Sequence, residues 1–160
     1  MLNITIIAIG KLKEQYLRDA SAEYQKRLSA SCKLNIVELN PEKLSDNPSA
    51  KEIENALNNE AKKIIEKIPK GAKVYSMCIE GKQRTSEELS TEIDALTVEG
   101  VSNIVFIIGG SFGLSDEVKK LSAYRLSMSK MTFPHQIARI MLLEQIYRAM
   151  QISLGTKYHK

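Results

Sequence analysis

Two hydrophobic periodicities alternate along the chain. Continuous apolar runs rich in β-branched residues predict strands at 3–9, 34–39, 73–79, 103–108 and 124–128. Stretches with apolar residues at helical spacing predict helices at about 13–28, 50–68, 85–98, 116–121 and 134–154. Thr85 and Ser115 each precede acidic residues, which is typical of a helix N-cap followed by its first turn.

The order of these elements predicts the fold class. Strands that are apolar at nearly every position are buried on both faces, and strands that alternate with helices form parallel sheets. We therefore expect an α/β fold with a mostly parallel sheet and helices on both faces. At 160 residues and 43% hydrophobic, the chain is long enough for one core and short for two, so residues 1–160 are taken as a single domain. The polar segment 40–49 reads as a flexible excursion.

Composition excludes some classes of protein and leaves others open. The 23 basic and 19 acidic side chains give a net charge of +4, which neither requires nor excludes a nucleic-acid partner. Cys32 and Cys78 stand apart without a CxxC motif or a Cys/His cluster, so we expect no disulfide, no metal and a cytoplasmic location. The first apolar run is too short to span a membrane and has no signal-peptide pattern around it.

A buried strand running directly into glycines is the first candidate for chemistry. The run 104–108 leads into Gly109, Gly110 and Gly113, where the backbone can approach a ligand at the carboxyl edge of a parallel sheet. The spacing is neither GxGxxG nor a P-loop, and Asp116 and Glu117 in the next helix would repel a phosphate. The pattern therefore favours a neutral or cationic ligand. The alternative is a tight turn that needs positive φ angles.

A second loop, at 126–135, passes from a strand end into the longest helix. Its small hydroxyl residues leave backbone groups free to contact a ligand, and the two loops could form one pocket. For Met128, Met131 and Phe133 the alternative is simple core packing. The helix 134–154 is apolar around most of its circumference, which suggests a subunit interface.

The end of the chain carries further polar groups. Glu144 and Arg148 are either functional or only a helix-stabilising ion pair at i, i+4. Gly155 is expected to end the helix, and the tail after it ends in Tyr158, His159 and Lys160. Such a tail could bind phosphate, stack on a base and move a proton, or it could be a frayed terminus.

Several motifs together resemble a known family. IIGGSFG, LSMSKMTFPHQIARIMLLEQIYRA and the terminal YHK resemble the RlmH family of bacterial large-subunit ribosomal RNA methyltransferases, and the opening ITIIAIGKLKEQYL extends the resemblance over essentially the whole chain. The resemblance implies a SPOUT fold with a C-terminal trefoil knot, a homodimer and the cofactor S-adenosylmethionine. It implies as substrate a pseudouridine of 23S rRNA, methylated at N3 on the assembled 70S ribosome.

The resemblance also implies site residues. Contacts to S-adenosylmethionine are expected at Met77, at Gly109 and along the knot loop, at Met128, Ser129, Lys130, Met131, Thr132 and Phe133. Tyr158 and His159 of one subunit are expected to bind or deprotonate the base above the other subunit's cofactor, with Arg148 orienting it. His135 is a competing proton acceptor. The rival interpretations are a non-catalytic ribosome-binding module and a dinucleotide-dependent oxidoreductase.

Overall fold

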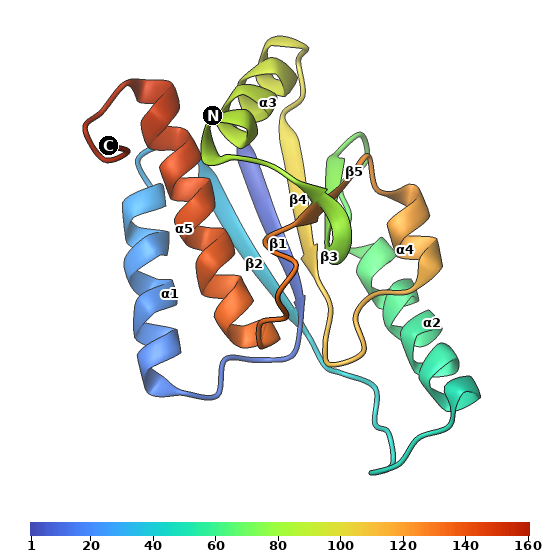
Figure 1. Cartoon of the computed structure of the whole chain (residues 1–160). Helices are drawn as coiled ribbons and strands as arrows, with labels where there is room; N and C mark the ends of the chain where they lie inside the picture. Colours follow the sequence, from blue (N-terminus) through green and yellow to red (C-terminus); the bar gives the residue numbers. More distant parts are fainter.

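The computed structural model describes residues 1–160 and contains one five-stranded sheet (Figure 1). The strand order is β2-β1-β4-β3-β5 and every pair is parallel, which confirms the predicted α/β class. The strands are β1 (Asn3–Ile9), β2 (Lys33–Leu39), β3 (Lys73–Gln83), β4 (Asn103–Ile108) and β5 (Tyr124–Ser127).

Five helices connect and follow the strands: α1 (Gln15–Leu28), α2 (Ala50–Glu66), α3 (Ser86–Val98), α4 (Asp116–Leu121) and α5 (His135–Leu154). The predicted N-caps are confirmed, because the hydroxyl of Thr85 accepts the backbone N–H of Glu88 and that of Ser115 accepts the N–H of Val118. Gly155 ends α5 in the left-handed conformation, as expected. None of these helices combines the length and the apolar character that crossing a membrane requires.

The sheet is covered on both faces, as its apolar strands predict. Alternate residues of β1 enter different cores: Ile4 and Ile6 pack with α1, α3 and α5, whereas Ile7 and Ile9 pack with α2 and α4. In Figure 1, α1 and α5 lie side by side over one face, and α2 and α4 lie together at the other. Both faces of the central strands are therefore buried, whereas the edge strand β2 remains partly exposed.

Strand β3 continues beyond the predicted end at residue 79. Residues 75–77 pair with β5, residues 78–81 leave the ladder, and Lys82 and Gln83 pair with β5 again. A Cβ on Gly81 would lie 2.8 Å from the carbonyl carbon and oxygen of Arg125, so only glycine fits at this close approach. The bulge at 78–81 projects from the carboxyl end of the sheet.

The segment 40–49 contains no helix or strand, as predicted, but it is attached to α2. The buried carboxylate of Glu60 accepts the backbone N–H of Glu42 at 2.9 Å. Lys63 forms a 3.0 Å ion pair with the side chain of Glu42. Whether this segment is flexible remains a prediction.

Candidate functional site

A cavity of about 790 Å³ lies at the carboxyl ends of β3 and β4. Three segments far apart in the sequence form it: the end of β3 with its bulge, the glycine loop 109–113, and the loop 128–134 that leads into α5. The predicted cofactor residues that line it are Met77, Gly109, Met128, Ser129, Met131, Thr132 and Phe133. Lys130 does not line the cavity and is exposed on the same loop.

The glycine loop is a tight turn that closes one side of the cavity. The N–H of Gly113 donates to the carbonyl of Gly110 at 3.1 Å. A Cβ on Gly109 would lie 2.3 Å from the carbonyl oxygen of Gly113, so the backbone of the turn occupies the space that a side chain would need. Of the three glycines in this loop, only Gly113 has a positive φ, of +81°. The turn therefore requires glycine at 109 because of close approach, and at 113 because of φ.

The loop 128–134 is held by its own hydroxyl groups. Ser127 Oγ donates to the carbonyl of Ser129, and the N–H of Met131 donates to Ser129 Oγ, both at 3.0 Å. Met128 packs against the core, whereas Met131 is 74% exposed. Core packing thus accounts for Met128 and is wrong for Met131, whose side chain stands at the cavity.

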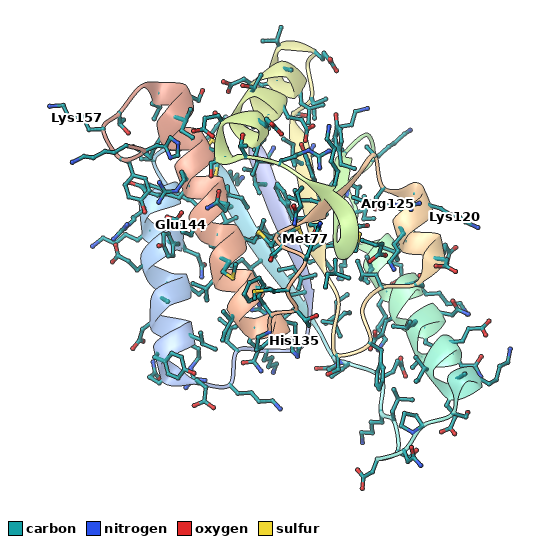
Figure 2. The ribbon with its side chains drawn as sticks, viewed as in Figure 1. Met77, Lys120, Arg125, His135, Glu144 and Lys157 are labelled. Atoms are coloured by element: carbon teal, nitrogen blue, oxygen red, sulfur yellow. The ribbon has the colours of Figure 1, made fainter.

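The start of α5 is attached to the carboxyl ends of β1 and β2 by a buried guanidinium. Arg139 is 3% exposed, and it forms a 2.5 Å ion pair with Glu38 and donates at 2.9 Å to the carbonyl of Gly10. His135 lines the cavity beside it. Burial lowers the pKa of His135 below its ordinary 6.5, and the charges of Arg139 and Lys13 lower it further. The imidazole that lines the cavity is therefore neutral near pH 7. Figure 2 shows His135 at the start of α5.

The bulge of β3 supplies lining residues that the sequence did not reveal: Cys78, Ile79 and Glu80. Glu80 forms a 2.6 Å ion pair with Lys119 of α4, which lowers the pKa of its carboxyl group. Burial raises the pKa of the Cys78 thiol. The one local signal was Gly81, an isolated glycine after an apolar run, which is typical of a bulge.

A second, smaller cavity of about 350 Å³ adjoins the first. It lies between the start of α3, the end of β5 and the middle of α5, and it shares Leu126 and Met128 with the larger cavity. Glu144, Gln145 and Ser86 give it polar walls, and Ser86 Oγ donates to Gln145 Oε1 at 2.6 Å. The end of β5 therefore separates the larger, mainly apolar cavity from a smaller one whose walls are mixed.

The predicted catalytic residues form a separate cluster around Glu144. Its Oε1 accepts from Arg148 Nε at 2.8 Å, and its Oε2 accepts from the phenol of Tyr158 at 2.6 Å. The guanidinium of Arg148 lies 4.8 Å from the centre of the Tyr158 ring. The hydrogen bond to Glu144 raises the pKa of Tyr158 to about 12, with a further contribution from burial. The i, i+4 ion pair is thus present, and it also holds the tail.

His159 completes this cluster through both ring nitrogens. Arg148 Nη1 lies 3.1 Å from Nδ1, and Glu87 Oε1 lies 2.5 Å from Nε2. An arginine can only donate, so Nδ1 is the acceptor and the Nε2–H donates to Glu87. Both ring nitrogens of His159 are therefore engaged in hydrogen bonds within the chain.

The tail is consequently folded back onto α5, and a frayed terminus is wrong for Tyr158 and His159. Figure 2 shows Glu144 on α5 and Lys157 on the tail, both apart from Met77 at the large cavity. Within one chain, Arg148, Tyr158 and His159 line neither cavity. No group of three His, Cys, Asp or Glu side chains could hold a metal ion.

Comparison with known proteins gives matches over the full length. A family model described as a predicted SPOUT methyltransferase matches residues 2–159. Ribosomal RNA large subunit methyltransferase H of Clostridium acetobutylicum is 54% identical over 99% of this chain and all of its own length. The proteins of the same name from Clostridium botulinum (strain Alaska E43) and Clostridioides difficile are 55% and 52% identical over the same shares.

A solved structure shares the fold. It is described as a probable methylase family protein from Haemophilus influenzae Rd KW20, and it aligns with a TM-score of 0.57 at 13% identity. The alignment covers 99% of this chain and 71% of that one. At this identity the likeness supports the architecture alone.

Proposed function

Since the chain belongs to the SPOUT methyltransferase family, within the group named ribosomal RNA large subunit methyltransferase H, we propose that it methylates 23S rRNA. The methyl group goes to N3 of a pseudouridine on the assembled 70S ribosome, and the methyl donor is S-adenosylmethionine. The observation that carries the proposal is the convergence of three separate segments, at Met77, Gly109 and 128–133, on one cavity. Family membership also implies the trefoil knot predicted from the sequence. It leaves the oxidoreductase interpretation without support.

The cavity suits S-adenosylmethionine by size and by lining. Its volume of about 790 Å³ lies within the range of roughly 300–1,000 Å³ that is usual for small-molecule sites. Apolar walls such as Met77, Leu126 and Phe133 fit an adenine ring, and the backbone of Gly109 permits close contact. When bound, the cofactor supplies a methyl group on a positively charged sulfur that is a good leaving group.

The protein then has three tasks: to hold the base in line with the methyl–sulfur bond, to exclude water and to accept the N3 proton. Alignment and exclusion of water can supply much of the acceleration. Because its pKa is raised to about 12, Tyr158 keeps its proton near neutral pH and is suited to donating to a carbonyl of the base. It is poorly suited to removing the N3 proton.

Two histidines compete as the proton acceptor. His135 lines the cofactor cavity and is neutral near pH 7, although its lowered pKa makes it a weak base. His159 reaches a cofactor only if the tail of one subunit extends over the cavity of the other, and Arg148 must first release its Nδ1, the ring nitrogen that can accept a proton. We favour His159, with Arg148 orienting the base. In a dimer, the tail of the second subunit would reach the cavity from the side on which the substrate base binds.

The proposal includes a homodimer that acts on cytoplasmic ribosomes. A net charge of +4 per chain is small for binding free RNA, and a dimer doubles it. A folded ribosome offers shape contacts that naked 23S RNA lacks. We therefore expect activity on 70S particles and little activity on free 23S RNA.

The deciding experiment measures transfer of a labelled methyl group from S-adenosylmethionine to 70S ribosomes that lack this modification. The intact chain is compared with one truncated after Leu154, and calorimetry measures cofactor binding by both. We expect both chains to bind the cofactor and only the intact chain to transfer the methyl group. No transfer by the intact chain would remove the proposed function and leave a ribosome-binding module.

A further inference from the structure

Negative charge is absent from one long segment of the chain. No Asp or Glu occurs between Glu117 and Glu144, although 26% of all residues are charged. The segment carries only cations: Lys119, Lys120, Arg125, Lys130 and Arg139. Of these, only Arg139 is fully buried. The remaining four lie on α4, on β5 and on the loop 128–134, which are elements that build or adjoin the cofactor cavity.

The sheet topology adds a fifth cation, from β3, to this region. Lys82 follows the bulge and pairs with Leu126, the residue after Arg125. Arg125 Nε donates to the carbonyl of Lys119 at 3.4 Å, which joins β5 to the last turn of α4. Figure 2 shows Arg125 and Lys120 close together beside α4. We call Lys82, Lys119, Lys120 and Arg125 the basic edge.

Most of the charge of the basic edge is not neutralised within the chain. Lys119 is paired with Glu80, whereas Lys82, Lys120 and Arg125 are exposed and take part in none of the ion pairs. Clustered like charges repel one another and destabilise the folded chain unless an anionic partner is present. The concentration of unpaired cations is therefore better explained by a partner than by stability.

The basic edge borders the candidate active site. Lys119 and Glu80 line the cofactor cavity, so Lys120, Arg125 and Lys82 stand next to its rim. Lys130 is exposed on the loop 128–134, between the lining residues Ser129 and Met131. A polyanion bound beside the cavity would therefore meet positive charge from α4, β5 and the loop 128–134.

We propose that the basic edge binds the phosphodiester backbone of the RNA beside the nucleotide that is methylated. The proposal rests on the function proposed above and assigns the surface that positions the ribosome. Lysine and arginine contacts to phosphates orient a protein on RNA without reading its sequence. A local cluster of this kind compensates for the small net charge of the whole chain.

The test compares two triple variants with the wild-type chain. Lys82→Gln, Lys120→Gln and Arg125→Gln remove the unpaired charge of the basic edge. The matched control, Lys62→Gln, Lys67→Gln and Lys70→Gln, removes three exposed, unpaired lysines at the end of α2 and before β3, away from the cavity. Binding to 70S ribosomes is measured by co-sedimentation over a range of salt concentrations, alongside the KM for ribosomes and the dissociation constant of S-adenosylmethionine.

We expect the edge variant to bind ribosomes at least about ten-fold more weakly, with its salt dependence reduced by about one unit of slope for each phosphate that it no longer neutralises. The control should resemble wild type, and all three proteins should bind the cofactor equally. An edge variant that binds and methylates ribosomes like the control would overturn this surface and leave the function intact. Edge-dependent binding without methyl transfer would overturn the function and leave the surface. If the wild-type chain co-sediments with phosphatidylserine vesicles but not with ribosomes, and the edge variant co-sediments with neither, the surface binds an anionic membrane instead.

Discussion

Replacing Gly109 by alanine tests whether the glycine turn shapes the cofactor cavity. The added Cβ would lie 2.3 Å from the carbonyl oxygen of Gly113 and 2.5 Å from its carbonyl carbon, and both atoms are backbone. Raising 2.3 Å to the 3.0 Å that such contacts need means opening the turn by about 0.7 Å. This movement would break the hydrogen bond from Gly113 to Gly110, which is worth about 1 kcal/mol.

With the strain of an overpacked site, of about 1–3 kcal/mol, the total cost is about 2–4 kcal/mol. If the free chain relieves this strain by opening the turn, cofactor binding must supply the energy that closes it again. The dissociation constant of the cofactor should then rise by at least about 30-fold. Titration calorimetry with S-adenosylmethionine measures this change, and calorimetric melting confirms that the variant is folded.

Gly110→Ala is the matched control in the same loop. Its Cβ would lie 3.3 Å from Ile9 Cγ2 and 3.8 Å from Ile9 Cβ, so the side chain of Ile9 need move by only a few tenths of an ångström, and Gly110 has no positive φ. We expect its affinity to stay within about three-fold of wild type. Equal affinities of the Gly109→Ala and Gly110→Ala variants would refute the argument that close approach within the turn shapes the site.

Three further predictions follow from the titratable groups. Tyr158→Phe removes the phenol hydroxyl that donates a hydrogen bond to Glu144, so we expect the free energy of unfolding to fall by about 1 kcal/mol. Cofactor binding should be unchanged and methyl transfer to ribosomes should fall about ten-fold or more, and unaltered transfer would exclude a role for the phenol. Because the pKa of His135 is lowered in the folded chain, the unfolded chain takes up this proton first as the pH falls; the free energy of unfolding should therefore decrease below about pH 6.5, and equal decreases in wild type and His135→Gln would contradict this. Burial raises the pKa of Cys32 to about 11, so a thiol reagent should not label Cys32 in the native chain and should label Cys78 slowly. S-adenosylmethionine should slow the labelling of Cys78 further, as measured by mass spectrometry, and a labelling rate that the cofactor does not change would argue against the place of Cys78 in the cavity.

The residues predicted to bind the cofactor meet, with one exception, at a single cavity, whereas the residues predicted to be catalytic lie outside it. Met77 follows the last residue of β3 that pairs with β4, and Gly109 and the loop 128–134 follow the ends of β4 and β5. Parallel strands place their carboxyl ends at one edge of the sheet. That rule needs only the element order. The exception is Lys130, whose side chain is exposed, because a loop residue without periodicity has no predictable direction.

The sequence by itself determined the α/β class, both strands of the central pair β1 and β4, and the N-caps at Thr85 and Ser115. These depend on hydrophobic period and on side chains that bond to backbone within one turn, and both are local in the chain. Only the tertiary structure decided the bulge of β3, the pairing of Arg139 with Glu38 and the contact of His159 with Glu87. Arg139 and Glu38 are 101 positions apart, and His159 and Glu87 are 72 apart. Such partners are set by how helices pack across a sheet, so no local pattern of residues records them.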